Sequence, residues 1–305
     1  MEPKLIWFKG KIVPLDEAKV SILSPSVQFG TSVFEGIRCY WNEENAQLYA
    51  FRLNCHLKRL LNSSKLLRFS HNFDFESLRK HFLETIIANK LKEDAAVRQV
   101  LFLDGFGSWS STSPVEMFIS PIPKQRCYLD NRIEGISCNI SSWERIHDRS
   151  FPPTIKVGAN YINSRLAQLE STLNGYDSPL FLNASGTVSE SAGACLFIVR
   201  NNTLITPPLS ASILESITRN TIIELAGHLN IEVVEREINR TELLIADEAF
   251  LCGTTVEIVP IIEIDKQPIG IKKKGKLTRS LQKIFFDTCR GNRDAATHWL
   301  TPVYT

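Results

Sequence analysis

A run of leucines early in the chain does most to limit the folds open to it. Four of them recur at i, i+4, i+7 and i+8: Leu53, Leu57, Leu60 and Leu61. This spacing places them on one side of a helix and predicts an amphipathic helix over about 53–66. The runs 34–40 and 47–51 just before it have the composition of strands and are predicted to pair antiparallel. A helix with one apolar face after such a pair indicates an α+β fold in which the helix covers a sheet.

The same alternation continues through the first 120 residues. Further strands are predicted at 5–13, 96–103 and 116–122. A second amphipathic helix is predicted over about 75–91, with four apolar residues on one face: Leu78, Phe82, Ile86 and Ile87. Prolines then interrupt the pattern. We therefore predict a small N-terminal α+β domain over 1–120 and an interdomain linker over 121–134.

The rest of the chain, 135–305, is predicted to form a larger α+β domain. Its expected strands are 135–140, 180–182, 195–199, 231–235 and 249–259. Its expected helices are 161–174, 218–229 and 277–289. The first of these helices ends at Gly175 and carries four apolar residues at helical spacing: Ile162, Leu166, Leu169 and Leu173.

Composition and charge exclude several classes of protein. The apolar, charged, Gly and Pro contents of the 305 residues are near globular averages, and the net charge is +2. The N-terminus has no signal-peptide pattern, and no segment has the length and apolar character of a membrane span. The seven cysteines contain no Cys-x-x-Cys, and the six histidines show no ligand spacing. We therefore expect a soluble cytoplasmic protein with reduced thiols, no metal site, and neither nucleic acid nor membrane as a partner.

Lys156 stands in an otherwise apolar stretch between a Pro-Pro break and a helix start. A lysine in this position either lays its stem over a core with the ammonium in water, or presents a partly desolvated amine. Desolvation lowers the pKa of an amine, and the neutral amine is the form that attacks an aldehyde to make a Schiff base. Taken alone, the first explanation is much the commoner.

Three other stretches have a chemical and an ordinary explanation. Glu190 precedes the small residues 191–194, which let a flat ligand approach closely, but it could equally be a hairpin glutamate. Residues 216–220 place hydroxyls at a helix start, which suits an anion or an ordinary N-cap. Residues 252–255 are small and hydroxyl-bearing at a strand end and suit a phosphate or a turn. Gly-rich dinucleotide, P-loop and nucleophile-elbow motifs are absent from the sequence.

Taken in order, these stretches resemble one known family, the class IV aminotransferases. The motifs that carry the resemblance are Phe34-Glu35-Gly36-Ile37-Arg38-Cys39-Tyr40, Lys156 with Gly158-Ala159-Asn160-Tyr161, Glu190-Ser191-Ala192-Gly193, Ile217-Thr218-Arg219 and Gly253-Thr254. They extend over nearly the whole chain and are most similar to bacterial branched-chain amino acid aminotransferases. The resemblance implies the α+β fold of fold type IV (D-amino acid aminotransferase-like) enzymes, which use pyridoxal 5′-phosphate (PLP).

The resemblance also implies roles for individual residues. Lys156 would form the Schiff base with PLP and then move a proton between the substrate Cα and C4′ of the cofactor. Glu190 would face the pyridine nitrogen and keep it protonated, which makes the ring an electron sink. Tyr161 would donate to the ring hydroxyl side. The phosphate would be held by Arg59, the N–H groups of Ile217 and Thr218, and Thr254.

The substrate contacts depart from the family pattern. A tyrosine usually precedes the glycine at Phe29-Gly30, and another usually stands at Ala96; the family uses both hydroxyls around the substrate carboxylate. Ser191, Cys195 and Ser216 also replace commoner residues of the motifs. The residues that remain as candidate substrate contacts are Phe34, Gly36, Arg38, Arg98, Tyr128 and Thr255.

The function implied is transfer of an amino group between a branched-chain or other apolar L-amino acid and 2-oxoglutarate by a ping-pong cycle, in a homodimer or higher homo-oligomer. Because of Phe29 and Ala96, a D-amino acid or (R)-amine transaminase or an aminodeoxychorismate lyase stays an alternative within the family. The segment Arg38-Cys39-Tyr40 favours the branched-chain branch. A non-catalytic PLP-binding protein is the alternative from another class, and the retention of Lys156 and Glu190 argues against it.

Overall fold

The computed structural model describes residues 4–123 and 134–304. Contacts divide the chain into two compact units. The first comprises Met1–Arg126, Ile155–Ala159 and Asp287–Thr305, and the second Cys127–Thr154 and Asn160–Phe286. These units divide the chain differently from the predicted domains, because two later segments join the first unit. Most of the predicted linker lies outside the described residues, and its first residues, 121–123, end a strand.

The first unit is built on a seven-stranded sheet with the order β16-β4-β3-β5-β6-β1-β2. Its strands are β1 (Leu5–Phe8), β2 (Lys11–Pro14), β3 (Ser32–Asn42), β4 (Gln47–Phe51), β5 (Ala95–Leu103), β6 (Val115–Pro123) and β16 (Leu300–Pro302). Each neighbouring pair in this order is antiparallel. The predicted antiparallel return of β4 on β3 is confirmed, with Cys39 opposite Ala50 and Asn42 opposite Gln47.

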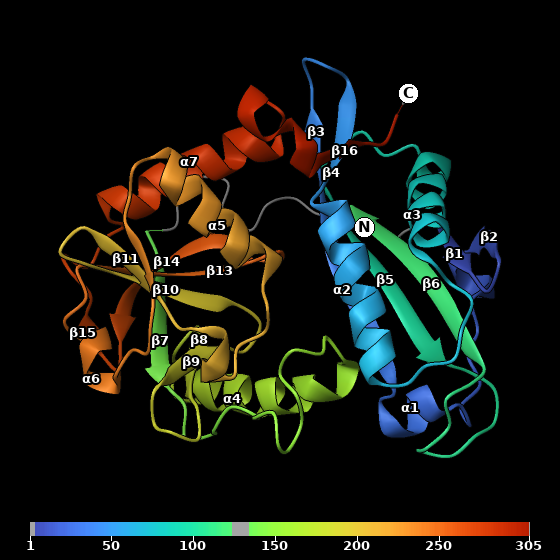
Figure 1. Cartoon of the computed structure of the whole chain (residues 1–305), viewed down its shortest axis with the longest axis horizontal. Coiled ribbons are helices and arrows are strands. Elements are labelled where there is room, and N and C mark those ends of the chain that lie inside the picture. Colours follow the sequence, from blue (N-terminus) through green and yellow to red (C-terminus); the bar gives the residue numbers. More distant parts are fainter. Residues whose placement is uncertain (1–3, 124–133, 305) are drawn as a thin grey trace. The chain divides into compact units, whose positions relative to one another are not determined.

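Two helices, α2 (Leu53–Leu66) and α3 (Phe75–Asn89), pack on this sheet (Figure 1). The predicted bounds of α2 are confirmed, and Leu53, Leu57 and Leu60 are fully buried. The helix α3 begins at a capping box formed by Asp74 and Ser77. Of the four apolar residues predicted on one face of α3, Leu78, Phe82 and Ile86 are fully buried, whereas Ile87 is 46% exposed.

The strand β3 separates two different environments. Val33, Glu35 and Ile37 face α2 and α3 and are completely buried. Because side chains alternate along a strand, Phe34, Gly36 and Arg38 belong to the opposite face. β3 thus presents one set of side chains to the helices and another to the other side of the sheet.

A short helix, α1 (Pro25–Phe29), occupies a stretch for which no helix was predicted. Ser24 caps it by accepting a hydrogen bond from the Val27 amide, and Pro25 occupies its first turn. Gly30 ends it with a φ of 70°, a left-handed conformation that glycine adopts readily. The remaining short helical turns of this unit are 3-10 helices at Leu15–Glu17 and Asp294–Trp299.

The second unit contains a mixed sheet with the order β12-β11-β10-β13-β14-β7-β8-β9 and β15 beside β14. Its strands are β7 (Ile136–Ile140), β8 (Ser178–Leu182), β9 (Val188–Ser191), β10 (Cys195–Arg200), β11 (Thr203–Thr206), β12 (Val233–Glu235), β13 (Glu248–Gly253), β14 (Glu257–Ile264) and β15 (Gln267–Pro268). An apolar cluster that includes Leu196, Ile198, Leu251 and Ile261 forms its core. The four-residue strand β9, which carries Glu190, was not expected.

The helices of this unit are α4 (Tyr161–Leu173), α5 (Ile217–His228), α6 (Arg240–Leu243) and α7 (Lys276–Cys289), with 3-10 turns at Gly158–Asn160 and Leu209–Ala211. α4 packs on β8 and α5 on β13. None of the helices within residues 4–123 and 134–304 combines the length and hydropathy of a membrane span.

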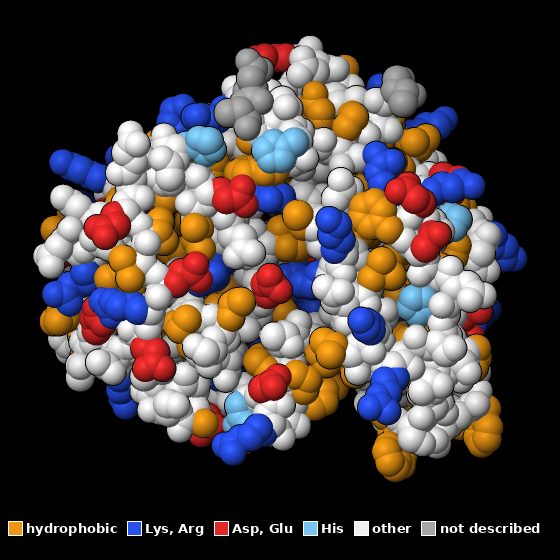
Figure 2. Space-filling model, in the orientation of Figure 1, with side chains coloured by type: hydrophobic (Ala, Val, Ile, Leu, Met, Phe, Trp, Pro, Cys, Tyr) orange, Lys and Arg blue, Asp and Glu red, His pale blue; other side chains and the backbone are white. Residues whose placement is uncertain are grey.

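The helix α4 is where we predicted it, but its apolar stripe does not face the core. Ile162, Leu166, Leu169 and Leu173 are between 37% and 87% exposed. The buried positions are Ser164, Ala167 and Ser171, which lie on the other side of the helix at 100° per residue. On the visible face of the space-filling view, hydrophobic side chains reach the surface among interspersed acidic and basic ones (Figure 2).

Candidate active site

Lys156 lies in a short segment fastened to the edge of β3. β4 pairs only with the second half of β3, so the edge beside Val33 and Phe34 is open to another partner. Val157 forms an antiparallel bridge with Val33, and the Phe34 amide donates to the Lys156 carbonyl at 3.0 Å. The Lys156 amide donates to Ser63 Oγ on α2 at 3.2 Å. The backbone of the lysine is therefore fixed from two sides.

The side chain of Lys156 is presented against an aromatic ring. Its Nζ lies 5.0 Å from the centre of the Phe34 ring. The flanking residues Ile155 and Val157 are 4% and 2% exposed, whereas Lys156 itself is intermediate. Buried neighbours on both sides anchor this part of the chain, and Lys156 keeps part of its surface exposed.

A buried cluster of charged groups stands on the helix-facing side of β3. Glu35 accepts hydrogen bonds from Arg59 Nε at 2.7 Å and Arg59 Nη2 at 2.8 Å, and His56 Nδ1 lies 2.7 Å from its Oε2. Burial raises the pKa of Glu35, but the charge and hydrogen bonds of Arg59 outweigh it, so the pKa falls from 4.5 to about 2. Burial also lowers the pKa of His56 against the opposing effect of Glu35. A neutral His56 donates through Nδ1, and Glu35 holds the Arg59 guanidinium in a fixed orientation.

The other face of the same sheet carries the four candidate substrate residues of the first unit. Three of them occupy every second position in one stretch of β3: Phe34, Gly36 and Arg38. Arg98 lies directly opposite Gly36 on β5. The Arg98 guanidinium stacks 4.3 Å from the Phe34 ring, and Arg38 is only 2% exposed. Two cationic side chains and one aromatic ring are thus brought to one face.

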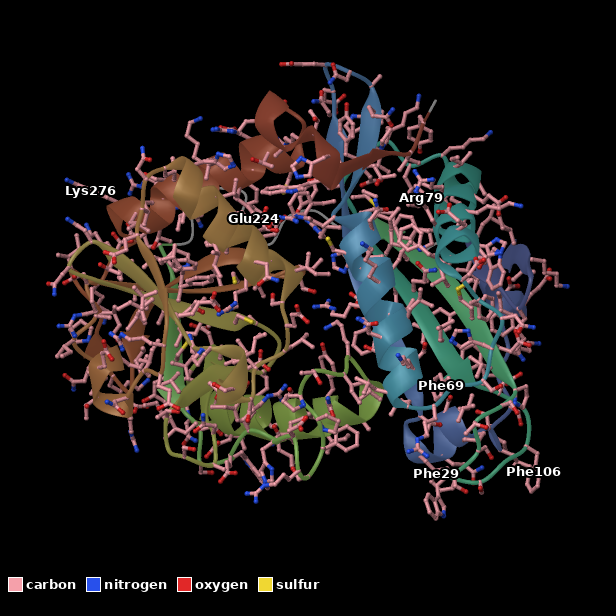
Figure 3. All side chains as sticks on the ribbon, viewed as in Figure 1. Phe29, Phe69, Arg79, Phe106, Glu224 and Lys276 are labelled. Atoms are coloured by element: carbon pink, nitrogen blue, oxygen red, sulfur yellow. The ribbon has the colours of Figure 1, made fainter. Side chains whose placement is uncertain are left out.

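Ala96, where the family usually has a tyrosine, is the direct cross-strand neighbour of Arg38. Side chains at such positions lie about 5 Å apart at Cβ. The small side chain of Ala96 therefore leaves room beside the Arg38 stem. Phe29, at the other departure, is 45% exposed at the end of α1, and Figure 3 shows its side chain and that of Phe106 pointing away from the ribbon.

In the second unit, Glu190 is 4% exposed on β9. Its Oε1 forms an ion pair with Arg145 Nη2 at 2.7 Å and accepts from the Leu214 amide at 3.2 Å. Its Oε2 accepts from the Cys195 thiol at 3.6 Å. Burial, together with the charge of Glu190, raises the pKa of Cys195 well above its ordinary value, so the thiol keeps its proton and acts as the donor.

The start of α5 leaves backbone donors for an anion. Ser216 Oγ accepts from the Arg219 amide at 3.2 Å, which makes Ser216 the N-cap. No hydrogen bond of the Ile217 or Thr218 amide is found within the described part of the chain. Free amides at the first turn of a twelve-residue helix form an anion site, reinforced by the helix dipole.

Glu190 and Thr254 are connected through neighbouring strands. Cys195, which donates to Glu190, is the cross-strand partner of Cys252, and Gly253 and Thr254 follow directly. A Cβ on Gly253 would lie 3.2 Å from the Gly193 carbonyl, so a larger residue would crowd this close approach. Thr255 is exposed in the turn that follows, and Tyr161, the first residue of α4, is 39% exposed.

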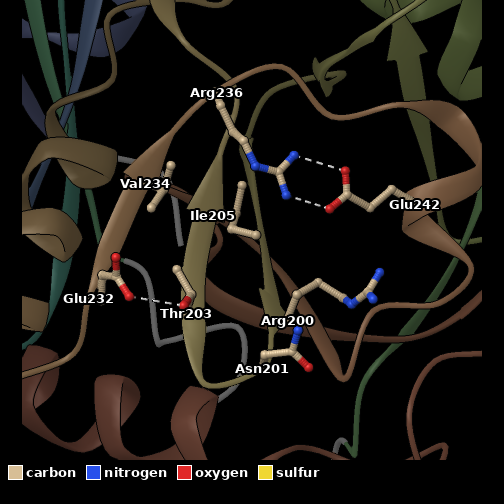
Figure 4. Close-up of a pocket in the computed structure, with 8 residues that line it drawn as sticks. All are labelled: Arg200, Asn201, Thr203, Ile205, Glu232, Val234, Arg236 and Glu242. Atoms are coloured by element: carbon tan, nitrogen blue, oxygen red, sulfur yellow. Dashed lines mark hydrogen bonds and ion pairs between the residues drawn. The ribbon is translucent and has the colours of Figure 1, made fainter.

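A surface pocket of the second unit contains none of the predicted site residues (Figure 4). It is lined by Arg200, Asn201, Thr203, Ile205, Glu232, Val234, Arg236 and Glu242. Arg236 donates twice to Glu242, and Thr203 donates to Glu232 at 3.2 Å. Across the residues that the structure describes, no group of three His, Cys, Asp or Glu side chains has the arrangement of a metal site.

Residues 32–264 match the family described as amino-transferase class IV. The chain belongs to the class IV aminotransferases. A probable branched-chain-amino-acid aminotransferase of Aquifex aeolicus is 40% identical over 303 residues, covering 98% of this chain and 96% of that protein. The predicted membership of this family is therefore confirmed.

Solved class IV aminotransferases have the same fold. The branched-chain amino acid aminotransferase of Thermobaculum terrenum in its PLP-form has a TM-score of 0.94 and is 40% identical, covering 100% of this chain and 99% of its own. The branched-chain aminotransferase of the archaeon Thermoproteus uzoniensis with norvaline has a TM-score of 0.91 and is 40% identical, covering 98% and 99%. The fold type IV α+β architecture predicted from the sequence is confirmed.

In this class IV aminotransferase, three polar residues that surround Arg59 and Glu190 were assigned no role from the sequence. They are Glu35, His56 and Arg145. The sequence did contain signals for Glu35 and His56. Glu35 shares one face of the strand with the apolar residues Val33 and Ile37. His56 precedes Arg59 by three residues and so lies on the same helix face. Arg145 lies between a strand and a helix, where no period predicts the direction of a side chain. Tyr128, predicted to contact substrate, lies outside the described residues.

Proposed function

We propose that this chain is a PLP-dependent aminotransferase that moves amino groups between a branched-chain or other apolar L-amino acid and 2-oxoglutarate. The observation that carries this proposal is the presentation of Lys156, whose backbone is pinned to β3 and α2 while its amine faces the Phe34 ring. Support for the substrate class comes from the relatives, which are named branched-chain aminotransferases, and from the norvaline in one of them.

The bound cofactor supplies an aldehyde that reacts with amines and a ring that withdraws electrons from the substrate Cα. Lys156 is the amine that would hold PLP covalently and, once released by the substrate, move the proton between Cα and C4′. A fixed backbone suits both tasks, because proton transfer requires the nitrogen within hydrogen-bonding distance of both carbons in turn. The bonds to Ser63 and Phe34 provide that fixation.

The phosphate of PLP fits the donors at the start of α5. The amides of Ile217 and Thr218 are not used elsewhere among the described residues, and Thr254 is a further hydroxyl donor. Arg59 would add charge, with its guanidinium oriented by Glu35. These donors suit a dianion better than a neutral ligand.

The ring of PLP fits a buried carboxylate that has one lightly used oxygen. Glu190 Oε2 receives only the weak Cys195 donor among the described residues, so it can accept from a protonated ring nitrogen. Tyr161 would donate on the ring hydroxyl side. Ionised Glu190 would keep the ring nitrogen protonated and the ring electron-withdrawing.

The substrate carboxylate would be bound by Arg38 and Arg98, whose guanidinium groups supply planar donors on the face of β3 that carries Phe34 and Gly36. Phe34 would contact the apolar side chain of the substrate. Tyr128 and Thr255 stay predicted contacts. The loss of the two family tyrosines, at Phe29 and Ala96, would be compensated by these arginines.

Amino-donor specificity tests the proposal directly. The PLP-loaded protein would be assayed with 2-oxoglutarate and one donor at a time: L-leucine, L-valine, L-norvaline, D-alanine or (R)-1-phenylethylamine. We expect turnover with the three L-amino acids and none with the last two donors. Turnover restricted to D-alanine or the amine would contradict the substrate class and leave the cofactor assignment intact.

We also propose that the chain functions as a homodimer, as the family resemblance implies. The exposed apolar stripe of α4 is a surface that a second copy could cover. Leu169→Glu places a charge in this stripe, whereas Ser280→Glu places one on an exposed position of α7. Sedimentation velocity should find a dimer for the wild type and Ser280→Glu and a monomer for Leu169→Glu. A Leu169→Glu dimer of unchanged affinity would exclude this stripe as the interface.

A further inference from the structure

The two oxygens of Glu190 have very different partners. Oε1 forms an ion pair with Arg145 Nη2 at 2.7 Å and accepts from the Leu214 amide at 3.2 Å. Within the described residues, Oε2 receives only the Cys195 thiol, at a sulfur–oxygen distance of 3.6 Å. A thiol is a weak donor, whereas a buried guanidinium 2.7 Å from a carboxylate oxygen is a close counter-charge. One oxygen is therefore fully engaged and the other is almost unused.

Arg145 is itself held in place. It is 6% exposed, and its amide donates to the Leu182 carbonyl at 2.9 Å at the end of β8. Its Nη1 donates to Asn163 Oδ1 on α4 at 3.4 Å, and its guanidinium lies 5.7 Å from the centre of the Phe181 ring. Its Nε has no hydrogen-bond partner within the part of the chain that the structure describes. Among the described residues, the shortest polar contact of this buried guanidinium is therefore the one with Glu190.

The ion pair between Arg145 and Glu190 also offsets the cost of burying the Glu190 carboxylate. An ionised carboxylate that is 4% exposed is costly without a counter-charge, and removal of one partner from a buried ion pair is strongly destabilising. Arg145 supplies that charge when no ring nitrogen is present. Because it binds Oε1, it does so without occupying the oxygen that a ligand would need.

We propose that Arg145 is a positioning residue, which together with the Leu214 amide fixes Oε1 of Glu190 so that Oε2 is the oxygen that accepts from the protonated ring nitrogen of the cofactor. This inference rests on the proposed function. It assigns Arg145 a role through Glu190, not in contact with the reacting atoms. The charge of Arg145 and the planar shape of its guanidinium both contribute, since Arg145 supplies a counter-charge and keeps the Glu190 carboxylate from rotating.

Three variants separate this role from a merely structural one. Arg145→Met keeps the apolar stem and removes charge and donors. Arg145→Lys keeps the charge and loses the planar donor group. Arg149→Met, four residues later on an exposed position, is the matched control. Each folded variant would be characterised by its dissociation constant for PLP, the pH midpoint of the visible absorbance band of the PLP-loaded protein, and the thermal midpoint of the PLP-free protein.

Arg145→Met should weaken PLP binding about tenfold, because Glu190 is no longer held in place by its ion pair with Arg145. It should also move the pH midpoint of the visible band upward by about one pH unit, because a ring nitrogen that is less protonated withdraws fewer electrons from the Lys156 linkage. Arg145→Lys should recover part of both effects, and Arg149→Met should match the wild type. A structural role alone would lower only the thermal midpoint.

The proposal is overturned if folded Arg145→Met binds PLP with wild-type affinity and an unchanged pH midpoint, or if the midpoint moves downward. If Arg145→Met does not fold, Arg145→Lys decides, and wild-type values of both quantities in that variant overturn the proposal. A wild-type protein that gives no visible band with PLP would instead refute the proposed function, so the two failures are distinct.

Discussion

The buried Glu35–Arg59–His56 cluster predicts a specific pH dependence of stability. Glu35→Gln keeps the shape of the side chain but replaces a carboxylate oxygen by an NH2 group that faces the donors of Arg59. Both partners of this ion pair are buried, the Glu35 side chain completely and that of Arg59 with 11% exposed. Removing one partner of such a pair costs about 3 kcal/mol or more. We expect the variant to lose about that much unfolding free energy at pH 7.

The pKa of Glu35 gives the pH range of the effect. The carboxyl has an ordinary pKa of 4.5 and a pKa of about 2 in the folded protein. Between these values the unfolded chain binds a proton that the folded chain does not, so stability rises with pH. The gap corresponds to about 3 kcal/mol, which is present above pH 4.5 and is lost as the pH falls toward 2. By pH 3.5, about 1 kcal/mol of it should be lost.

Urea unfolding of the wild type and Glu35→Gln, followed by tryptophan fluorescence between pH 7 and 3.5, measures both effects. The difference between the two proteins should shrink by about 1 kcal/mol over this range, since only the wild type loses the Glu35 contribution. Glu44→Gln is the control, because that side chain is exposed in the turn between β3 and β4, so the substitution should change the unfolding free energy by about 0.5 kcal/mol or less. A Glu35→Gln protein as stable as the wild type at pH 7, or a difference independent of pH, would refute the argument.

Two further predictions follow from the site. Ala96→Tyr places a hydroxyl beside Arg38 and should lower the KM for 2-oxoglutarate about threefold, with kcat changed less. The reason is that one added hydrogen bond is worth about 1 kcal/mol or less at a partly solvated site. A raised KM would show that the phenol blocks the substrate instead. Ser216→Ala removes the cap that accepts the Arg219 amide and should cost about 1 kcal/mol of unfolding free energy, whereas Ser216→Thr should retain most of it; equal losses in both variants would contradict the capping role.

Local patterns predicted the elements of the fold well where a period was long and strong. The leucine spacing of α2 gave both of its ends, whereas the position of Glu35 on the helix-facing side of β3 was not predicted. The short helix α1 was missed even though Ser24, Pro25 and Gly30 are ordinary start and stop residues. Five residues are too few for a hydrophobic period to develop.

The α4 stripe shows what a period cannot tell. The spacing of Ile162, Leu166, Leu169 and Leu173 predicts a helix with one apolar side, and that helix exists. The same spacing does not say what covers the apolar side, and the helix packs on its own unit through Ser164, Ala167 and Ser171 instead. Burial of an apolar stripe depends on tertiary and quaternary contacts that are absent from the local sequence.

The charged groups around Arg59 and Glu190 show the same limit of sequence-based prediction for the site. Family resemblance predicted Lys156, Arg59 and Glu190, but not the side chains that orient them. Glu35 lies 24 residues before Arg59 and could be paired with it only from the strand and helix periods together. Arg145 lies 45 residues before Glu190 in an irregular segment, so their 2.7 Å ion pair is a product of the fold alone.

The central claim is that the Lys156 amine holds PLP covalently. The most direct measurement is the visible absorbance spectrum of the purified protein after PLP is added and the unbound cofactor is removed, compared with Lys156→Ala and with the control Lys266→Ala. The account predicts a retained visible band for the wild type and Lys266→Ala that converts when L-leucine is added, and no retained band for Lys156→Ala. A band of equal intensity in Lys156→Ala, or none in the wild type, would contradict it.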